Sequence, residues 1–387
     1  MLSSTPRKFA VVGAGIAGTA CSHALILAGH SVHLFDKSRG PGGRLATRRL
    51  EWVDRNGQAC TTRLDHGAVG ITARSAAFQS FIDQAVHAGW LVEWVPVQAA
   101  GSLPLEDGDR ICVPEPDMPA LCRRLLDGVT TTWSFAVDSL YKSPAGWQVE
   151  AAGERHSAQF DAVVLALPPA QASPLLSAHR KDWAGHASVI PMQPCWTLMG
   201  IAAAPEPAVR WDLARPPAGP LAWVLRNDAR PGRERVPGRA HWVTHARAAW
   251  SRQHLEQPAA WVQQQLQDAL AEYLGQPVDW HHSVVHRWRY ALPPAQGLAP
   301  SEPCWWDADQ GLGVCGDFLG GTGVEGAWLS AQSLSAAIFR SASDAAAYAS
   351  ARAQDESVRQ QACSGTGLEQ PAGDNGVNTL AVHAGSR

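Results

Sequence analysis

Apolar and polar positions change period several times over the first 45 residues. Residues 9–12 form a short apolar run, residues 16–28 form a longer apolar run without an internal proline, and residues 31–35 are β-branched and aromatic. A short run that ends in a turn is typical of a buried strand, whereas a longer run with glycine after it is typical of a helix. The pattern therefore predicts a strand, a helix and a second strand.

The turn between the first strand and the helix carries glycine at fixed spacing. Gly13, Gly15 and Gly18 follow the G-x-G-x-x-G pattern, and Asp36 ends the second strand. In a βαβ unit this spacing lets a pyrophosphate approach the helix N-terminus and places a carboxylate near a ribose. We expect a dinucleotide site here; the alternative is a glycine-rich turn in an ordinary α/β core.

A second diglycine follows closely, at Gly42-Gly43-Arg44. A nicotinamide dehydrogenase has little use for it, but a guanidinium at this point can reach the same pyrophosphate. The pairing of the two glycine turns favours FAD over NAD.

The middle of the chain alternates between strand-like and helix-like patterns. Residues 162–166 are typical of a parallel strand covered on both faces, and Pro168-Pro169 is expected to end it where the chain crosses into a second domain. A more antiparallel sheet is predicted from residues 195–203, 220–225, 240–247 and 286–292, with one helix over 251–274.

A second glycine-rich segment lies near the C-terminal end. A strand at 313–317 ends in Gly316-Asp317, and a helix over 324–340 opens after Gly320-Gly321-Thr322-Gly323. The N–H groups of such a first turn stabilise negative charge, as on a reduced flavin, and Asp317 is placed to hold a ribityl hydroxyl. No His or Cys lies at 324–327, so we expect the FAD to be non-covalent.

Composition narrows the class of protein. The chain has 387 residues, 45% of them hydrophobic, and a net charge of −3, so bulk charge attracts it neither to nucleic acid nor to an anionic membrane. No apolar run is long enough to span a bilayer, and a cytoplasmic location is expected. The eight cysteines form no C-x-x-C pair and no zinc-type cluster with histidine, so we expect reduced thiols and no metal.

Several of these segments together carry a family resemblance. DKSRGPGGR, LDHGA with TAR behind it, HARAAWSRQHLE, HRWRYA and CGDFLGG followed by GVEGAWLS resemble the bacterial renalase-like flavoproteins, a branch of the FAD-dependent amine oxidase superfamily, over about residues 7–340. The chain departs from many relatives at Val69-Gly70-Ile71, where they carry an aromatic pair, and at Gly323, where they carry arginine.

The resemblance implies a fold and a domain division. The fold is α/β, with a glutathione-reductase-type FAD-binding Rossmann domain and a second, mixed-sheet substrate domain of amine oxidase type. Residues 1–75, 107–185 and 295–340 would form the FAD domain, 76–106 and 186–294 the substrate domain, and 341–387 a disordered tail.

It also implies an activity: oxidation of isomeric dihydro-NAD(P) to NAD(P)⁺ by hydride transfer to flavin N5, with O2 as acceptor and H2O2 as product. Because aromatisation drives that step, no catalytic side chain is nominated. The cofactor-binding residues would be Gly13, Ala14, Gly15, Ile16, Ala17, Gly18, Asp36, Lys37, Gly43, Arg44, Leu45, His66, Gly67, Ala68, Val69, Gly316, Asp317, Val324, Glu325, Gly326 and Ala327. His245, Arg287, Trp288 and Tyr290, on predicted strands of the substrate domain, are the candidates for lining the substrate pocket.

Three other functions stay open at this point. The superfamily fold equally supports an amine oxidase or a desaturase acting on a small molecule. A flavoprotein without turnover would serve as a binding or redox-sensing module. An NADP-binding protein without flavin would use only the first glycine turn.

Overall fold

The apolar runs at the start and in the middle of the chain lie side by side at the centre of one sheet. The computed structural model describes residues 6–105, 110–293 and 302–342. Within them β1 (Lys8–Val12) pairs in parallel with β11 (Ala162–Leu165). Phe9 and Val11 pack into one core, and Ala10 and Val12 pack into another on the opposite face. Burial on both faces explains why these strands are apolar at every position.

This sheet has six strands, all parallel except one at the edge. In spatial order they are β17 (Trp305–Asp307), β18 (Leu312–Val314), β11, β1, β2 (Ser31–Phe35) and β7 (Thr130–Thr132), with β17 antiparallel to β18. The order of the parallel strands is that of a Rossmann sheet. The predicted α/β class with a Rossmann-type domain is confirmed.

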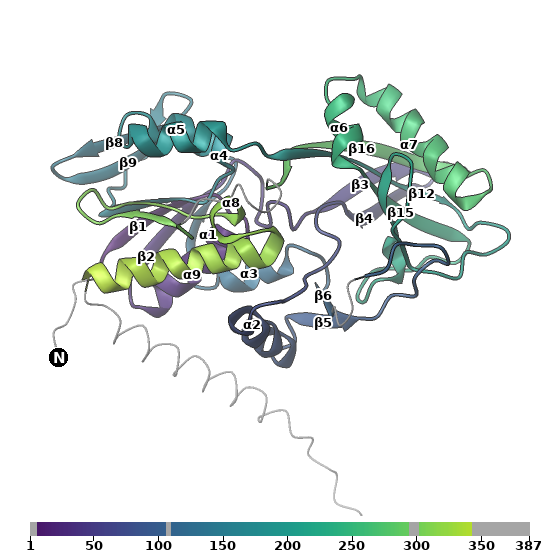
Figure 1. Cartoon of the computed structure of the whole chain (residues 1–387), viewed down its shortest axis with the longest axis horizontal. Coiled ribbons are helices and arrows are strands. Elements are labelled where there is room, and N and C mark those ends of the chain that lie inside the picture. Colours follow the sequence, from purple (N-terminus) through teal and green to yellow (C-terminus); the bar gives the residue numbers. More distant parts are fainter. Residues whose placement is uncertain (1–5, 106–109, 294–301, 343–387) are drawn as a thin grey trace, which may run out of the picture.

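Helices cover one face of the sheet, and helices and a small sheet cover the other (Figure 1). The first face carries α1 (Ile16–Leu27), α3 (Ala120–Leu125) and α9 (Gly323–Ala342). The second carries α4 (Pro169–Leu176), α5 (Lys181–Val189) and the three-stranded sheet of β8 (Ser139–Ser143), β9 (Gly146–Ala151) and β10 (Glu154–Arg155).

The expected domain crossing at Pro168-Pro169 is wrong. Pro169 is instead the first residue of α4, a position at which proline is favoured because its missing N–H has no helical partner there. Both α4 and α5 pack on the Rossmann sheet before the chain enters the second sheet at Gln193.

The second sheet is antiparallel and forms the other lobe in Figure 1. Its strands, in spatial order, are β13 (Leu213–Ala214), β14 (Leu221–Arg226), β15 (Arg239–Ala246), β12 (Gln193–Ala203) and β16 (Trp280–Leu292). Leu198 of β12 faces a local core under the helices of this lobe, and its neighbour Met199 joins the core that continues into the Rossmann lobe.

The single helix predicted over 251–274 is also wrong, because it is two helices. α6 (Ala248–Gln253) and α7 (Ala259–Leu274) are separated at Pro258, which sits at the N-cap of α7. Val262, Leu266 and Leu270, spaced four residues apart, give α7 its buried face.

The remaining elements are smaller. They are the hairpin β3 (Thr47–Val53) and β4 (Ala59–Asp65), α2 (Ala76–His87), the pair β5 (Leu91–Trp94) and β6 (Ile111–Pro114), the short helix η1 (Asn227–Ala229) and α8 (Asp317–Gly320). The pair β5–β6 spans the boundary expected near residue 106, so the proposed domain division stays a prediction. The expected disordered tail lies, from residue 343 onward, outside the described residues.

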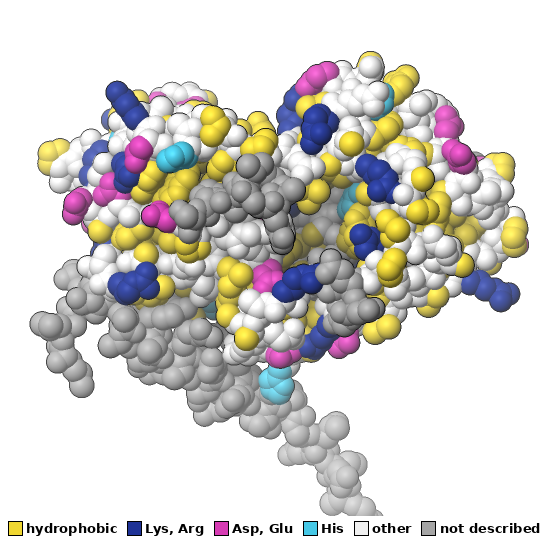
Figure 2. All heavy atoms as spheres, in the orientation of Figure 1, with side chains coloured by type: hydrophobic (Ala, Val, Ile, Leu, Met, Phe, Trp, Pro, Cys, Tyr) yellow, Lys and Arg dark blue, Asp and Glu magenta, His cyan; other side chains and the backbone are white. Residues whose placement is uncertain are grey.

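The face of the molecule drawn in Figure 2 shows no dominant charge. On the face drawn in Figure 2, acidic and basic side chains are interspersed over both lobes, which are separated by a notch at the upper edge. None of the helices in residues 6–105, 110–293 and 302–342 is both long and apolar enough to cross a bilayer. The same described residues hold no group of three or more His, Cys, Asp or Glu side chains placed to bind a metal ion.

Candidate functional site

One wall of the candidate site is built from backbone at the N-terminus of α1. Gly13 adopts φ +109°, and a Cβ there would lie 2.4 Å from the carbonyl oxygen of Ala166. Gly15 caps α1 without any side-chain hydrogen bond, so the first N–H groups of the helix stay available for an anion. A Cβ on Gly15 would meet no protein atom within 4 Å, because this side of the turn faces a cavity.

The second glycine turn packs directly on the first. The N–H of Gly42 donates to the carbonyl of Ala14 over 2.9 Å, and a Cβ on Gly43 would come within 3.1 Å of the Cα of Gly15. The two motifs that pointed to one pyrophosphate are therefore neighbours in space.

Asp36 joins this wall from the end of β2. Its carboxylate accepts hydrogen bonds from the backbone N–H groups of Ala14 and Ser38, each at 2.7 Å. The carboxylate and its neighbour Lys37 both line the cavity. The hydrogen bonds fix the acid at the position where a ribose was expected.

Arg44 and Asp317 meet across 273 positions of sequence. Their side chains form a bidentate ion pair with N–O distances of 2.6 and 2.7 Å, and Arg44 also donates to the carbonyl of Ala291. The Asp317 side chain is 2% exposed and that of Arg44 33%. The sequence suggested separate partners, phosphate for the arginine and a ribityl hydroxyl for the acid, whereas here each engages the other.

The opposite wall is built from side chains of the second sheet and the segment 66–69. The indole N–H of Trp288 donates to the carbonyl of His66 over 3.1 Å, and the two rings stack with centroids 5.2 Å apart. His286 packs edge-on against both rings, at 4.9 Å from His66 and 4.3 Å from Trp288. The result is a small aromatic cluster on the cavity wall.

The histidines of this wall are held uncharged. Burial, with a smaller contribution from His286, lowers the pKa of His66 to about 3, and burial lowers the pKa of His245 to about 4. Burial also lowers the pKa of His286. Within the described part of the chain, the buried Nδ1 of His66 and Nε2 of His245 have no hydrogen-bond partner.

Two arginines of β16 complete this side. Arg287 and Arg289 both pair with the exposed carboxylate of Glu256, at 2.9 and 2.7 Å. Both line the cavity, as does Tyr290 between Arg289 and Ala291.

Most of the residues named from the sequence thus line one cavity of about 1220 Å³. They are Gly13, Gly15, Ile16, Ala17, Asp36, Lys37, Gly43, Arg44, Leu45, His66, Gly67, Ala68, Val69, His245, Arg287, Trp288, Tyr290, Gly316, Asp317, Val324 and Ala327. Pockets for one drug-sized ligand run to about 1,000 Å³, so this volume accommodates a dinucleotide together with part of a second molecule.

Four named residues do not line the cavity. Ala14 is buried beneath the turn, and a Cβ on Gly18 would lie 1.9 Å from the carbonyl oxygen of Gly13, so that glycine serves helix packing. The Glu325 carboxylate instead accepts from the N–H groups of Arg74 and Ser75, and Gly326 packs on the carbonyl of Gly321. Glu325 thus links α9 to the start of α2, and its expected contact with the cofactor stays a prediction.

Some lining residues were missed by the sequence reasoning. His286 stands within the recognised HRWRYAL segment, but Trp223 on β14, and Cys195 and Thr197 on β12, carried no motif signal. The lining carboxylates are Asp36, Asp138 and Asp317, and none of them belongs to the second sheet. The side-chain wall therefore offers aromatic, neutral and cationic groups.

Comparison with known proteins gives the domain and the fold. A family model described as an NAD(P)-binding Rossmann-like domain matches residues 11–85. A tRNA 5-methylaminomethyl-2-thiouridine biosynthesis bifunctional protein MnmC from Magnetococcus marinus is 29% identical over 200 residues, which is 42% of this chain. The chain spans only 30% of the length of that curated relative.

Among solved structures, similarity extends over nearly the whole chain. A putative protoporphyrinogen oxidase from Exiguobacterium sp. 255-15 matches 87% of this chain and 99% of its own, with a TM-score of 0.63 and 11% identity. Cyclohexylamine oxidase from Brevibacterium oxydans matches the same shares with a TM-score of 0.59 and 12% identity. Putrescine oxidase, in a study of its cofactor binding, matches with a TM-score of 0.57 and 15% identity. These likenesses show a shared two-lobed fold.

Proposed function

We propose that the chain is an FAD-dependent oxidase, renalase-like in oxidising isomeric dihydro-NAD(P) with O2 and releasing NAD(P)⁺ and H2O2. The observation that carries this is the single cavity whose one wall suits a pyrophosphate and whose other wall suits an uncharged or anionic ring system. When bound, FAD would supply the acceptor of two electrons and the route to O2.

The backbone wall fits FAD. The uncapped N-terminus of α1, the open space beside Gly15 and the adjacent Gly43 form a cradle that a side chain at either glycine would fill. Asp36 is held at the correct end for an adenosine ribose. Arg44 is the one-third-exposed partner of its ion pair, so its guanidinium can bind phosphate while keeping one bond to Asp317.

The side-chain wall argues for the substrate class. A carboxylate would stabilise an ammonium substrate, and the second sheet contributes none to the cavity among the described residues. His66 and His245 are neutral and add no charge to this wall, which suits the uncharged ring of a dihydronicotinamide. Arg287 and Arg289 would favour a substrate that carries phosphates.

The residues of this wall orient the substrate and exclude water from it. They exchange no proton in the proposed step. Trp288 offers an aromatic face on which a flat ring can stack, and its N–H fixes the carbonyl of His66. Close alignment of two flat rings is the contribution that such a site makes to transfer between them.

An amine oxidase is the second candidate. It is favoured by the solved structures of similar fold whose names specify amines, putrescine and cyclohexylamine, and by the aromatic lining of Trp223, Trp288 and Tyr290. A flavoprotein without turnover would be yellow but would produce no H2O2. An NAD(P)-binding protein without flavin would be colourless and would also produce no H2O2.

The test combines cofactor content with turnover. We expect the purified protein to be yellow, to release FAD on denaturation and to produce H2O2 with isomeric dihydro-NAD(P). A colourless protein that cannot be loaded with FAD contradicts the cofactor; a yellow protein that produces H2O2 only with primary amines contradicts the substrate.

A further inference from the structure

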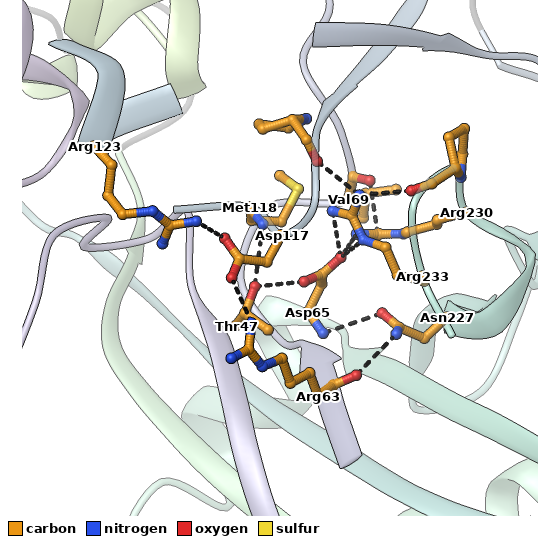
Figure 3. A network of polar contacts seen from close by, with 12 residues as sticks. Thr47, Arg63, Asp65, Val69, Asp117, Met118, Arg123, Asn227, Arg230 and Arg233 are labelled. Atoms are coloured by element: carbon orange, nitrogen blue, oxygen red, sulfur yellow. Dashed lines mark hydrogen bonds and ion pairs between the residues drawn. The ribbon is translucent and has the colours of Figure 1, made fainter. Parts of the chain in front are cut away.

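Directly behind the side-chain wall lies a buried cluster of three charged side chains (Figure 3). Asp65, at the end of β4, receives Arg230 and Arg233, which follow η1 in the second lobe. One oxygen of Asp65 accepts from Arg230 over 3.1 Å and from Arg233 over 2.8 Å. The side chains of Asp65, Arg230 and Arg233 are 1%, 1% and 4% exposed.

The cluster carries an excess positive charge. Two guanidinium groups face one carboxylate, whose other oxygen accepts from the neutral hydroxyl of Thr47 over 2.5 Å. The acids of the loop are engaged or exposed: Asp228 pairs with Arg226, and Glu234 is exposed. Burying an uncompensated charge is costly, and the Nε of Arg230 has no hydrogen-bond partner within the described residues.

The charge is tied to the cavity wall. Arg230 donates to the carbonyl of Val69 over 2.7 Å, and Val69 lines the cavity. The N–H of Asp65 donates to the side chain of Asn227 over 3.0 Å, so the strand that leads into His66 is also held. Arg230 additionally contributes to the lowered pKa of His245, which lines the same wall.

We propose that Arg230 and Arg233 are positioning residues that fix the segment 66–69, and that their excess charge over Asp65 favours the negatively charged, reduced form of a cofactor bound against that segment. This inference rests on the proposed binding of FAD. A positive charge in a water-excluded site acts over several ångströms because little solvent screens it. Two-electron reduction that leaves a negative charge on the ring would be favoured, and the midpoint potential raised.

A charge series on the FAD-loaded protein tests the inference by measuring the midpoint potential of the bound cofactor. Arg230→Gln and Arg233→Gln each leave one cation with one carboxylate and are expected to lower the potential. A roughly tenfold loss of affinity for the reduced relative to the oxidised cofactor corresponds to about 30 mV for a two-electron couple. Asp65→Asn leaves two cations and is expected to raise the potential.

Three further variants separate charge from structural damage. The double variant Asp65→Asn/Arg230→Gln restores one excess charge and is expected to return close to the wild-type potential, as is Arg230→Lys, which keeps the charge. Arg235→Gln is the matched control, since Arg235 lies in the same loop but is exposed and bonds only to backbone carbonyls of residues 228 and 229. Its effect should be within error because solvent screens it.

The outcomes are distinct. Potentials that follow the sign of the charge support the inference even if the protein oxidises an amine instead of dihydro-NAD(P), in which case only the proposed substrate falls. Potentials unchanged in Arg230→Gln and Arg233→Gln, or shifted in the same direction by every variant, overturn it while leaving the proposed function intact. If the wild-type protein cannot bind FAD, both proposals fall. Should Asp65→Asn not fold, Arg230→Gln, Arg233→Gln and Arg230→Lys still give the sign.

Discussion

The two walls of the cavity are built on different principles. The wall at α1 carries backbone N–H groups and glycines of residues 13–44 and two carboxylates, those of Asp36 and Asp317. The opposite wall consists of side chains that β12, β14, β15 and β16 bring to the segment 66–69. A backbone wall recognises what every dinucleotide shares, whereas a side-chain wall selects one substrate, so variants of the two should separate cofactor binding from substrate choice.

The largest effect is expected from closing the backbone wall. Gly15→Ala places a methyl group in the open space over the α1 N-terminus, where it clashes with no protein atom. We expect FAD affinity to fall by on the order of a hundredfold while the fold is kept. Titration of apoprotein with FAD measures this. Gly40→Ala, where a Cβ also meets nothing but outside the cavity, should bind FAD normally. Equal FAD affinity in the two variants would contradict phosphate binding at this turn.

Breaking the ion pair between Arg44 and Asp317 in the backbone wall should come next. Arg44→Met leaves the 2%-exposed carboxylate of Asp317 without its partner, and we expect a loss of about 2 kcal/mol in the free energy of unfolding. Arg44→Met/Asp317→Asn should recover part of that loss because the unpaired charge is gone. Arg55→Met removes an arginine from an exposed pair with Asp279 and should cost less than about 1 kcal/mol. Denaturant unfolding of the wild-type protein and the three variants measures these losses. If Arg44→Met is no less stable than Arg44→Met/Asp317→Asn, the pairing is contradicted.

Acid should weaken the side-chain wall selectively. The pKa of His245 is about 4 in the folded protein against an ordinary 6.5, so the unfolded chain binds more protons between these values. Stability is therefore present above pH 6.5 and is lost as pH falls toward 4, by roughly 1.4 kcal/mol per pH unit. His245→Gln should flatten the slope of unfolding free energy against pH. An unchanged slope would mean that His245 is not held neutral.

The smallest effect is expected from one hydrogen bond. Trp288→Phe keeps an aromatic face but loses the N–H donated to the carbonyl of His66. We expect a loss of about 1 kcal/mol, seen as a roughly fivefold rise in KM with kcat nearly unchanged. Trp261→Phe, at a ring that is 38% exposed, is the control. A fall in kcat alone would instead place the indole in the reacting geometry.

The difference between the backbone wall and the side-chain wall also explains which features could be predicted from the sequence. The glycine turns and Asp36 lie on neighbouring elements, so their spacing alone indicated a shared site, and the apolar runs of β1 and β11 indicated a doubly covered sheet. The break at Pro258 carried a local signal that the apolar spacing of 251–274 obscured. The start of α4 at Pro169 was obscured in the same way, since proline both ends strands and begins helices.

The side-chain wall depended on information that no local pattern holds. Which face of β16 meets the cavity is set by its pairing with β12, so His286 could not be distinguished from its neighbours. The pair Arg44–Asp317 and the cluster around Asp65 join segments more than 160 positions apart. Because such contacts follow from tertiary packing, spacing in the sequence predicts the residue types but not the partners.

The most direct test of the central claim is anaerobic mixing of the FAD-loaded protein with isomeric dihydro-NAD(P) or with a primary amine, while the visible flavin absorbance is followed. We expect rapid bleaching of the flavin absorbance by at least one dihydro-NAD(P) isomer and none by the amine, because the side-chain wall has neutral and cationic groups. Bleaching by the amine, with every dihydro-NAD(P) isomer leaving the flavin oxidised, would contradict it.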